Sequence, residues 1–318
     1  MKTHLLLDVS NLVYRVALSQ PDDTDTDVGV AINKALLSLN KFYKKYNAHD
    51  VIVVFDSPKS WRKSWTSEKN EDRVTHKVYK AHRRKNLTQS KLAKLQAIDS
   101  QLNDLYEMFK VQTGLVVLKE PHLEADDLIA GYVAKFEHDK HIVVSADKDF
   151  IQLLSNGNVT LMDPLTEKPR DLAEWEHDAA YFMFEKCLRG DIGDNVQSAY
   201  PNLRSKKIKE AYTDEFTRTN IMNHTFVVES LDDEGKLQEH KYTTKDLFEE
   251  NKLLMDLFYQ PDYIKELMDE SITKSIQDRG TFNYFSFLKF LGKHDLQAIL
   301  KDVDKFVPLL SGKGRGNL

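Results

Sequence analysis

Several carboxylates of this sequence stand at the ends of apolar runs. Asp8 ends HLLLD, Asp56 ends DVIVVFD, and Asp147 ends HIVVSAD, with Asp149 two residues further on. One acid in such a place is commonly a turn former or the cap of the next helix. Three of them are harder to explain in this way, because carboxylates packed together raise one another's pKa and oppose folding unless a cation neutralises them. The pattern therefore indicates a metal site.

The segment EADDLIAGYVAKF, residues 124 to 136, adds three acids at the start of a predicted helix. Acids in a first helical turn interact favourably with the helix dipole, by about 0.3 to 1 kcal/mol each. This capping effect explains one or two of Glu124, Asp126 and Asp127. Asp126 lies three and seven positions before Ile129 and Val133, so we expect it to face the predicted sheet.

These carboxylates suit a particular kind of ion. A set of oxygen ligands without His or Cys favours Mg²⁺, with Mn²⁺ as a substitute. Seven acids exceed what one octahedral ion needs, and two ions about 3.5 to 4 Å apart would suit hydrolysis of a phosphodiester. GDIGDNV, residues 190 to 196, supplies two more acids, Asp191 and Asp194.

The positive charge of the chain is concentrated in one segment. Residues 59 to 94 contain twelve Lys or Arg and three acids, a local net charge of +9, although the formal net charge of the whole chain is −5. Basic residues at this density neutralise phosphates. Trp61, Trp65 and Tyr79 lie among them and could stack on unpaired bases. The segment is therefore predicted to contact nucleic acid.

Alternating strands and helices must position these residues. Helical spacing of apolar residues occurs at 32–46, 92–109 and 128–136. The apolar runs between the helices are continuous, which is typical of parallel strands covered on both faces. We therefore predict an α/β fold with a mostly parallel central sheet and helices on both faces, whose carboxyl edge binds the ligand. The predicted strands are 4–10, 50–56, 114–120, 141–147 and 159–163.

The strand pattern stops after about residue 172. Residues 174–212 and 244–310 are predicted to be mostly helical, and 226–242 alternates around an Asp-Glu-Gly turn as a β-hairpin does. We predict an α/β domain over 1–186 and a helical C-terminal domain over 187–318 that ends in a mobile tail.

Composition excludes several classes of protein. The single cysteine, Cys187, cannot form an intramolecular disulfide, and no Cys/His spacing suits zinc. The three-leucine run before Asp8 is too short for a signal peptide, and no apolar stretch approaches the length of a membrane span. No GxxxxGK[ST] loop supports NTP hydrolysis. A cytoplasmic protein without a membrane partner is expected.

Taken in order, six blocks resemble the 5′ nuclease (flap endonuclease) superfamily. They are HLLLDVSN, VIVVFD, VYKAHRRK, LEADDLIA, VVSADKDF and GDIGDNV. Within it, the sequence resembles most closely the ribonuclease H group of T-even-like bacteriophages, which are 5′ to 3′ exonucleases. The resemblance implies a PIN-like fold and Mg²⁺-dependent removal of RNA primers and 5′ flaps during replication, with exonuclease activity on RNA·DNA and DNA duplexes.

The resemblance also implies roles for individual residues. Lys80 and Arg83 match residues held over the scissile phosphate, within an arch or bridge of about residues 57–95. A helix-turn-helix-like element of the C-terminal region would bind duplex. The implied metal ligands are Asp8, Asp56, Glu124, Asp126, Asp127, Asp147, Asp149, Asp191 and Asp194. The expected nucleic-acid contacts are Arg62, Lys63, Tyr79, Arg84, Lys85, Arg204, Lys206, Lys207 and Lys209.

One block departs from the family pattern. Many relatives follow the last acidic pair with a glycine-rich hairpin that binds a monovalent ion, whereas this chain reads NVQSAYPNLRSKKIKEAY. The difference argues against a potassium site. Resemblance to phage replication nucleases further implies a monomer that meets a sliding clamp and a single-strand-binding protein, in the host cytoplasm if the chain is phage-encoded.

Three other functions stay open at the level of the sequence. A PIN-type RNA endonuclease would use the same acids, but it typically lacks the basic arch and the GDxGDN block. An aspartate-nucleophile phosphatase would need a second acid two residues after Asp8, where Ser10 stands. A non-catalytic nucleic-acid binder would not require so many clustered acids.

Overall fold

The computed structural model describes residues 1–19, 27–67, 73–75, 77–83, 87–231 and 237–312. The chain forms two compact units. Unit 1 comprises Met1–Lys59, Asn86–Asp171 and Asp262–Leu318, and unit 2 comprises Ser60–Lys85 and Leu172–Pro261. This division differs from the predicted boundary at residue 186, because both units combine segments that are distant in the sequence.

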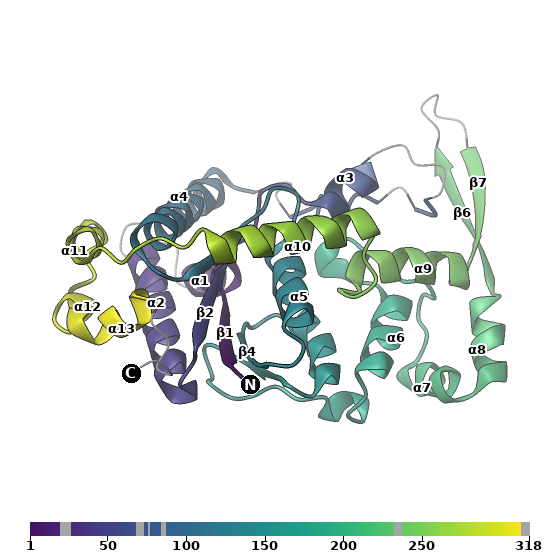
Figure 1. The fold of residues 1–318 in the computed structure, drawn as a ribbon. Coiled ribbons are helices and arrows are strands. Elements are labelled where there is room, and N and C mark those ends of the chain that lie inside the picture. Colours follow the sequence, from purple (N-terminus) through teal and green to yellow (C-terminus); the bar gives the residue numbers. More distant parts are fainter. Residues whose placement is uncertain (20–26, 68–72, 76, 84–86, 232–236, 313–318) are drawn as a thin grey trace. The chain divides into compact units, whose positions relative to one another are not determined.

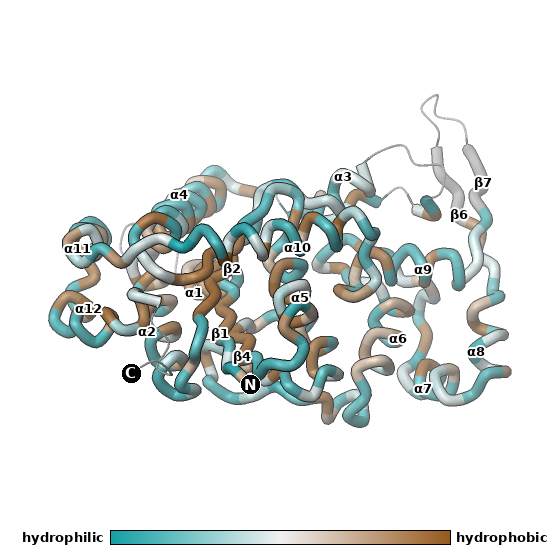
Figure 2. The backbone as a smooth tube through the Cα atoms, in the orientation of Figure 1, coloured by the Kyte–Doolittle hydropathy of each residue, from teal (hydrophilic) through white to brown (hydrophobic). Residues whose placement is uncertain are grey.

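Unit 1 contains a five-stranded parallel sheet in the order β3-β2-β1-β4-β5. Leu5 of β1 pairs with Val51 on one side and with Ile142 on the other, so β1 is the central strand. All five predicted strands are confirmed, and the apolar residues of β1 and β2 appear brown in Figure 2. The strands are β1 (Thr3–Asp8), β2 (Asp50–Val54), β3 (Val116–Leu118), β4 (Lys140–Val144) and β5 (Val159–Met162).

Helices cover both faces of this sheet, which explains why the strands are apolar without alternation. On one face, Leu5 and Leu7 lie in a large apolar cluster with residues of α1 (Val9–Ser19), α2 (Asp27–Tyr46) and α4 (Gln89–Gln112). On the other face, α5 (Ala125–Lys135) packs against β1 and β2. The fold class predicted from the sequence is thereby confirmed.

The C-terminal helices complete unit 1. Figure 1 shows α10 (Asp262–Gln277) crossing the end of α5, where a Cβ on Gly131 would lie 3.2 Å from Ile272 and 3.4 Å from Met268. A Cβ on Gly114 would collide with the backbone of Ser311. These close approaches explain why the C-terminal residues belong to unit 1. The other elements are η1 (Lys148–Asn156), α11 (Tyr284–Lys293), α12 (Gln297–Leu300), η4 (Val303–Phe306) and α13 (Val307–Leu310).

Unit 2 is helical apart from one hairpin. β6 (Thr225–Leu231) and β7 (Leu237–Thr243) pair antiparallel, which confirms the predicted hairpin, and Phe226 stacks on Tyr242. The predicted turn falls on 232–236, outside the described residues, as do residues 313–318 of the predicted C-terminal tail. The other elements are α3 (Trp61–Ser67), η2 (Ala173–Trp175), α6 (Ala179–Arg189), η3 (Ile192–Asp194), α7 (Ser205–Thr213), α8 (Glu215–Met222) and α9 (Thr244–Met255).

Among the described residues, no helix combines the length and the apolar character that a bilayer crossing requires.

Candidate active site

Asp8 is the centre of a carboxylate cluster at the carboxyl edge of the sheet in unit 1. It is the last residue of β1 and is only 4% exposed. Its Oδ1 accepts a hydrogen bond from the backbone N–H of Asn11 at 3.0 Å, and its Oδ2 accepts one from Ser145 Oγ at 3.0 Å. Asp56 and Asp147 follow β2 and β4 and act on Asp8 as neighbouring negative charges. The sequence therefore predicted correctly that these three acids gather at one edge.

The environment of Asp8 opposes its negative charge. Burial raises the pKa of Asp8 well above its ordinary value, and the charges of Asp56 and Asp147 raise it further. The hydrogen bonds from Asn11 and Ser145 act in the opposite direction but do not cancel this effect. A bound cation would remove the conflict. The cluster therefore fits a hard divalent ion with oxygen ligands.

The acids at the start of α5 are arranged by helix capping. Glu124 is the N-cap residue, and its backbone N–H donates to Asp127 Oδ2 at 3.0 Å in a capping box. Asp127 is fully buried, while Asp126 is partly exposed. The capping box turns Asp127 back towards Glu124 and makes it the more buried of the two acids, and the expectation that Asp126 faces the sheet stays a prediction. Asp56 Oδ1 accepts a hydrogen bond from the backbone N–H of Ala125 at 2.9 Å, which joins this helix to the cluster.

Two buried serines that the sequence analysis did not select orient the acids. Ser145 Oγ donates to Asp8 and accepts a hydrogen bond from the backbone N–H of Asp147 at 3.1 Å. Ser10 Oγ accepts one from the backbone N–H of Asp56 at 2.9 Å. Both serines are about 2% exposed or less. Their positions, two residues after Asp8 and two before Asp147, are a spacing that could have pointed to them.

Asp147 and Asp149 lie at the start of η1 in unit 1. Asp147 is the N-cap residue, and its Oδ1 accepts a hydrogen bond from the backbone N–H of Asp149 at 2.9 Å. Both residues are partly exposed. This turn holds the Asp147 side chain against the backbone of Asp149, two residues further on.

In unit 2, the GDIGDN loop is a tight turn with its own hydrogen bonds. Asp191 caps η3 and accepts from the backbone N–H of Asp194 at 3.2 Å, and it forms a backbone bridge with Val196. Gly190 has φ +68°, and a Cβ there would collide with the backbone of Gln197, so this position requires glycine. Lys186 Nζ lies 3.6 Å from Asp191 Oδ2.

Asp194 is held by the basic residues that were predicted to contact the scissile phosphate. Tyr79 donates its hydroxyl to Asp194 Oδ2 at 2.9 Å, Lys80 Nζ lies 3.9 Å from the same oxygen, and Arg83 forms an ion pair with Oδ1. Burial alone would raise the pKa of Asp194, but the charges of Lys80 and Arg83 and the Tyr79 hydrogen bond hold it below its ordinary value. The structure thus brings Lys80, Arg83 and Asp194 together within unit 2.

Two of the predicted nucleic-acid contacts lie in the interior of unit 2. Arg62 is 1% exposed and donates from Nε to the carbonyl oxygen of Leu254 at 2.7 Å, and its guanidinium lies over the ring of Trp61. Tyr79 is 3% exposed and packs with Leu254. The predictions that Arg62 and Tyr79 contact nucleic acid, and that Trp61 stacks on bases, do not fit this burial. These side chains instead anchor the basic segment.

The remaining predicted contacts of the basic segment are either partly exposed or lie outside the described residues. Lys63 is partly exposed, and its contact with nucleic acid stays a prediction. Trp65 is partly exposed, with the guanidinium of Arg73 over its ring. Arg84 and Lys85 lie outside the described residues.

The basic residues around α7 differ in their charge balance. Lys207 pairs with Glu210 at 3.1 Å, and Lys209 pairs with Glu176. Over the part of the chain that the structure describes, Arg204 and Lys206 have no acidic partner within ion-pair distance, and both are exposed. Arg204 and Lys206 are therefore the better candidates for phosphate contacts.

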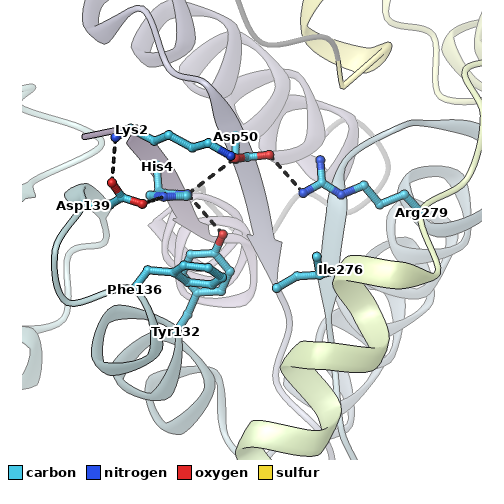
Figure 3. Close-up of a pocket in the computed structure, with 8 residues that line it drawn as sticks. All are labelled: Lys2, His4, Asp50, Tyr132, Phe136, Asp139, Ile276 and Arg279. Atoms are coloured by element: carbon cyan, nitrogen blue, oxygen red, sulfur yellow. Dashed lines mark hydrogen bonds and ion pairs between the residues drawn. The ribbon is translucent and has the colours of Figure 1, made fainter.

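At the amino edge of the parallel sheet in unit 1, carboxylates are paired with cations (Figure 3). Asp50 Oδ1 lies 2.9 Å from an Arg279 guanidinium nitrogen. Asp139 accepts from the backbone N–H of Lys2 at 2.7 Å and lies 3.1 Å from His4 Nε2. A cavity of about 140 Å³ lies among these side chains and Tyr132.

The fold and the acidic edge together define a PIN-like nuclease. The family model of the 5′-3′ exonuclease N-terminal, resolvase-like domain matches residues 3–183. The chain belongs to this family and hence to the 5′ nuclease superfamily, whose members hydrolyse phosphodiesters with metal ions.

Individual relatives agree with this assignment. The chain is 29% identical over 248 residues to the flap endonuclease Xni of Shewanella denitrificans, covering 76% of this chain and 86% of that protein. It is 28% identical over 316 residues to the 5′-3′ exonuclease of Aquifex aeolicus, covering 96% of each. Among solved structures, the bacteriophage T5 flap endonuclease in complex with DNA and metal ions has a similar fold, with a TM-score of 0.63, 19% identity and coverage of 87% of this chain and 99% of that chain.

Proposed function

We propose that this 5′ nuclease is a Mg²⁺-dependent, structure-specific enzyme that removes RNA primers and 5′ flaps from duplex DNA during replication. It would also act as a 5′ to 3′ exonuclease on RNA·DNA and DNA duplexes. The observation that carries the proposal is the carboxylate cluster around the buried Asp8, whose pKa is raised by burial and by two like charges. The acids of this cluster suit a metal cation, and the strongly basic segment of the chain suits a polyanion such as nucleic acid.

Residues of unit 1 would hold the metal. Asp56 and Asp147 each interact with Asp8, and Glu124 lies next to Ala125, whose N–H donates to Asp56. Asp126 and Asp127, at the start of α5, and Asp149, at the start of η1, would be further oxygen ligands. In unit 2, the family resemblance implies Asp191 and Asp194 as ligands. When bound, divalent ions would acidify an attacking water and balance the charge that develops on the phosphate.

Lys80 and Arg83 would bind the phosphate that reacts. Both carry positive charge, and their ion pairs with Asp194 orient them within unit 2. Preorganised cations stabilise developing negative charge without having to reorient during the reaction. When substrate binds, a phosphate oxygen would replace Asp194 as the partner of Lys80 and Arg83, so that neither cation is left without a negative partner.

The duplex would be held by phosphate contacts outside the reacting group. Arg204 and Lys206 are exposed cations without an acidic partner among the described residues. Each phosphate contact that they make should release a counterion, so binding should weaken as salt rises.

Cleavage of 5′-labelled flap, nicked and RNA·DNA substrates tests the proposal. Short products with 5′-phosphates are expected with Mg²⁺ and none with a chelator. Cleavage that persists in the chelator would refute the metal-dependent reaction. Cleavage of single-stranded RNA alone would instead support a PIN-type RNA endonuclease, and binding without any cleavage would support a non-catalytic binder.

Lys80→Ala tests the role of the basic pair. It should slow the single-turnover rate far more than it weakens binding, because the cation acts on the reacting phosphate. Equal losses in rate and binding would make Lys80 an ordinary phosphate anchor.

The cellular setting follows from the same proposal. We propose a monomer that works in the cytoplasm, which is that of the host if the chain is phage-encoded, with a sliding clamp and a single-strand-binding protein as partners. Resemblance to phage replication nucleases supports these partners. Co-purification with each candidate and the mass in solution test them.

A further inference from the structure

Glu250 is a buried carboxylate of α9 that neither the metal site nor the phosphate contacts use. It is 7% exposed. Its Oε2 accepts a hydrogen bond from the backbone N–H of Val74 at 2.6 Å. Its Oε1 accepts one from Thr75 Oγ1 at 2.9 Å and lies 3.3 Å from a guanidinium nitrogen of Arg73. Three consecutive residues of the basic segment therefore bind one side chain of unit 2.

Arg73 extends this contact along the basic segment. Its guanidinium donates to the carbonyl oxygen of Lys77 at 2.8 Å and to that of Thr66. The side chains of Arg73 and Glu250 are each only 5% exposed. A buried ion pair whose atoms also bind the backbone specifies one geometry, because any other arrangement leaves a charge without a partner.

The residues that follow are held at a second place. The backbone N–H of Lys80 donates to the carbonyl oxygen of Asp194 at 2.8 Å, and Asn195 Nδ2 donates to that of Val78 at 2.8 Å. Residues 73–75 and 77–83 form neither a helix nor a strand, and Lys80 has φ +54°. Hydrogen bonds to Glu250 and to the loop around Asp194, rather than regular structure, therefore hold this segment in place.

We propose that Glu250 is a positioning residue for Lys80 and Arg83. It fixes the start of the segment that carries them, and the loop around Asp194 fixes its end. This inference rests on the proposed function, in which Lys80 and Arg83 bind the reacting phosphate. Loss of the Glu250 charge leaves Arg73 buried without an anionic partner, and an amide keeps only one of the two oxygens that bind Val74 and Thr75. The positions of Lys80 and Arg83 then become less fixed.

Glu250→Gln tests this role, with Glu249→Gln as its matched control. Glu249 is the preceding residue of α9, is exposed, and loses the same charge. In single-turnover cleavage of a flap substrate with Mg²⁺, Glu250→Gln should slow the reaction by about 10- to 100-fold, with a much smaller change in the dissociation constant. Glu249→Gln should match the wild type. An unchanged rate, or equal losses in rate and binding, would overturn the inference.

Trypsin digestion of the metal-free protein gives a readout that does not depend on activity. Faster cleavage after Lys77, Lys80 and Arg83 is expected in Glu250→Gln than in the wild type and in Glu249→Gln. If Glu250→Gln does not fold, Thr75→Val removes one hydrogen bond without a charge change, and it should give the same two effects at smaller size. Digestion equal to that of the wild type in the folded variant would contradict the anchoring.

The two proposals fail in different ways. If the wild type cleaves nucleic acid and Glu250→Gln cleaves equally fast, only the positioning role is overturned. If the wild type does not cleave any substrate with Mg²⁺, the proposed function and the role that rests on it both fail.

Discussion

Strand β4 has an aspartate near each end, and the two lie in different electrostatic surroundings. Asp147 follows the strand at the carboxyl edge, where it adds negative charge to the buried Asp8. Asp139 precedes the strand at the amino edge, where hydrogen bonds from Lys2 and His4 hold its pKa below its ordinary value. Figure 3 shows the paired groups of that edge. The same sheet therefore balances the charge of its acids at one edge and gathers like charges at the other.

The contrast indicates what each edge is for. Acids that have cationic partners within the fold contribute to stability and do not need a bound metal ion. Acids that are buried beside other acids reduce stability unless an ion binds, which is how functional sites are usually built. Asp194 in unit 2 also has cationic partners, since Lys80 and Arg83 lower its pKa, although the family resemblance implies that it binds a metal as well. The acid motifs look alike in the sequence, but their surroundings separate them.

The largest difference between the two ends of β4 should appear in catalysis. Asp147→Asn removes a charge from the predicted metal site and should slow Mg²⁺-dependent cleavage by on the order of 10²- to 10³-fold. Asp139→Asn, at the other end of the same strand, should cleave as fast as the wild type. Single-turnover rates on a labelled flap substrate measure both. Equal rates for the two variants would break the comparison.

Mg²⁺ should stabilise the protein through the carboxyl edge alone. A ligand that binds only the folded state at a hundred times its dissociation constant adds about 2.7 kcal/mol to the free energy of unfolding. The wild type and Asp139→Asn should both melt at a higher temperature with Mg²⁺ than with a chelator. Asp8→Asn should show a much smaller shift. A full shift in Asp8→Asn would place the ion elsewhere.

Without metal, neutralising an acid should have opposite effects at the two edges. Asp8→Asn removes a charge that burial and like charges disfavour, so the metal-free variant should be as stable as the wild type or more stable. Asp50→Asn removes the partner of Arg279 and should lower the free energy of unfolding by about 1 kcal/mol. Urea unfolding in a chelator measures both. A loss of stability in Asp8→Asn would contradict the account of this cluster.

Local sequence patterns predicted the sheet and its acidic edge well. Each strand is a continuous apolar run, and an acid directly after such a run must lie at the carboxyl edge of a parallel sheet. The apolar runs alone were therefore enough to place Asp8, Asp56 and Asp147 together. The hairpin was predicted for a similar reason, since alternation around a turn is a local signal.

Features that depend on distant contacts could not be predicted in this way. The approach of Ser311 to Gly114 and of Met268 to Gly131 puts the C-terminal helices into unit 1, and no local pattern records it. Arg62 was expected at the surface because charge density does not tell which basic side chain is buried. Glu250 was missed because its role depends on residues 73–75, which are far from it in the sequence.

The smallest predicted effect concerns the amino edge and its response to pH. His141 of β4 is fully buried, and neither of its ring nitrogens has a hydrogen-bond partner among the described residues. The pKa of His141 is lowered from 6.5 to about 4, mainly by burial and also by the charge of His4, whose ring stacks on it, while Asp139 acts in the opposite direction. His141 is therefore neutral in the folded protein at pH 7.

The sign of the pH effect follows from this neutral state. The unfolded chain takes up a proton on His141 as pH falls through about 6.5, whereas the folded chain does so only near pH 4. Stability that is fully present above pH 6.5 is thus lost as pH falls towards 4, by roughly 0.7 kcal/mol between pH 7 and pH 6. His141→Phe keeps a ring in the stack and cannot titrate, so urea unfolding of this variant should depend less on pH over that interval. If the free energy of unfolding of His141→Phe depends on pH as strongly as that of the wild type, groups other than His141 cause the loss of stability at low pH.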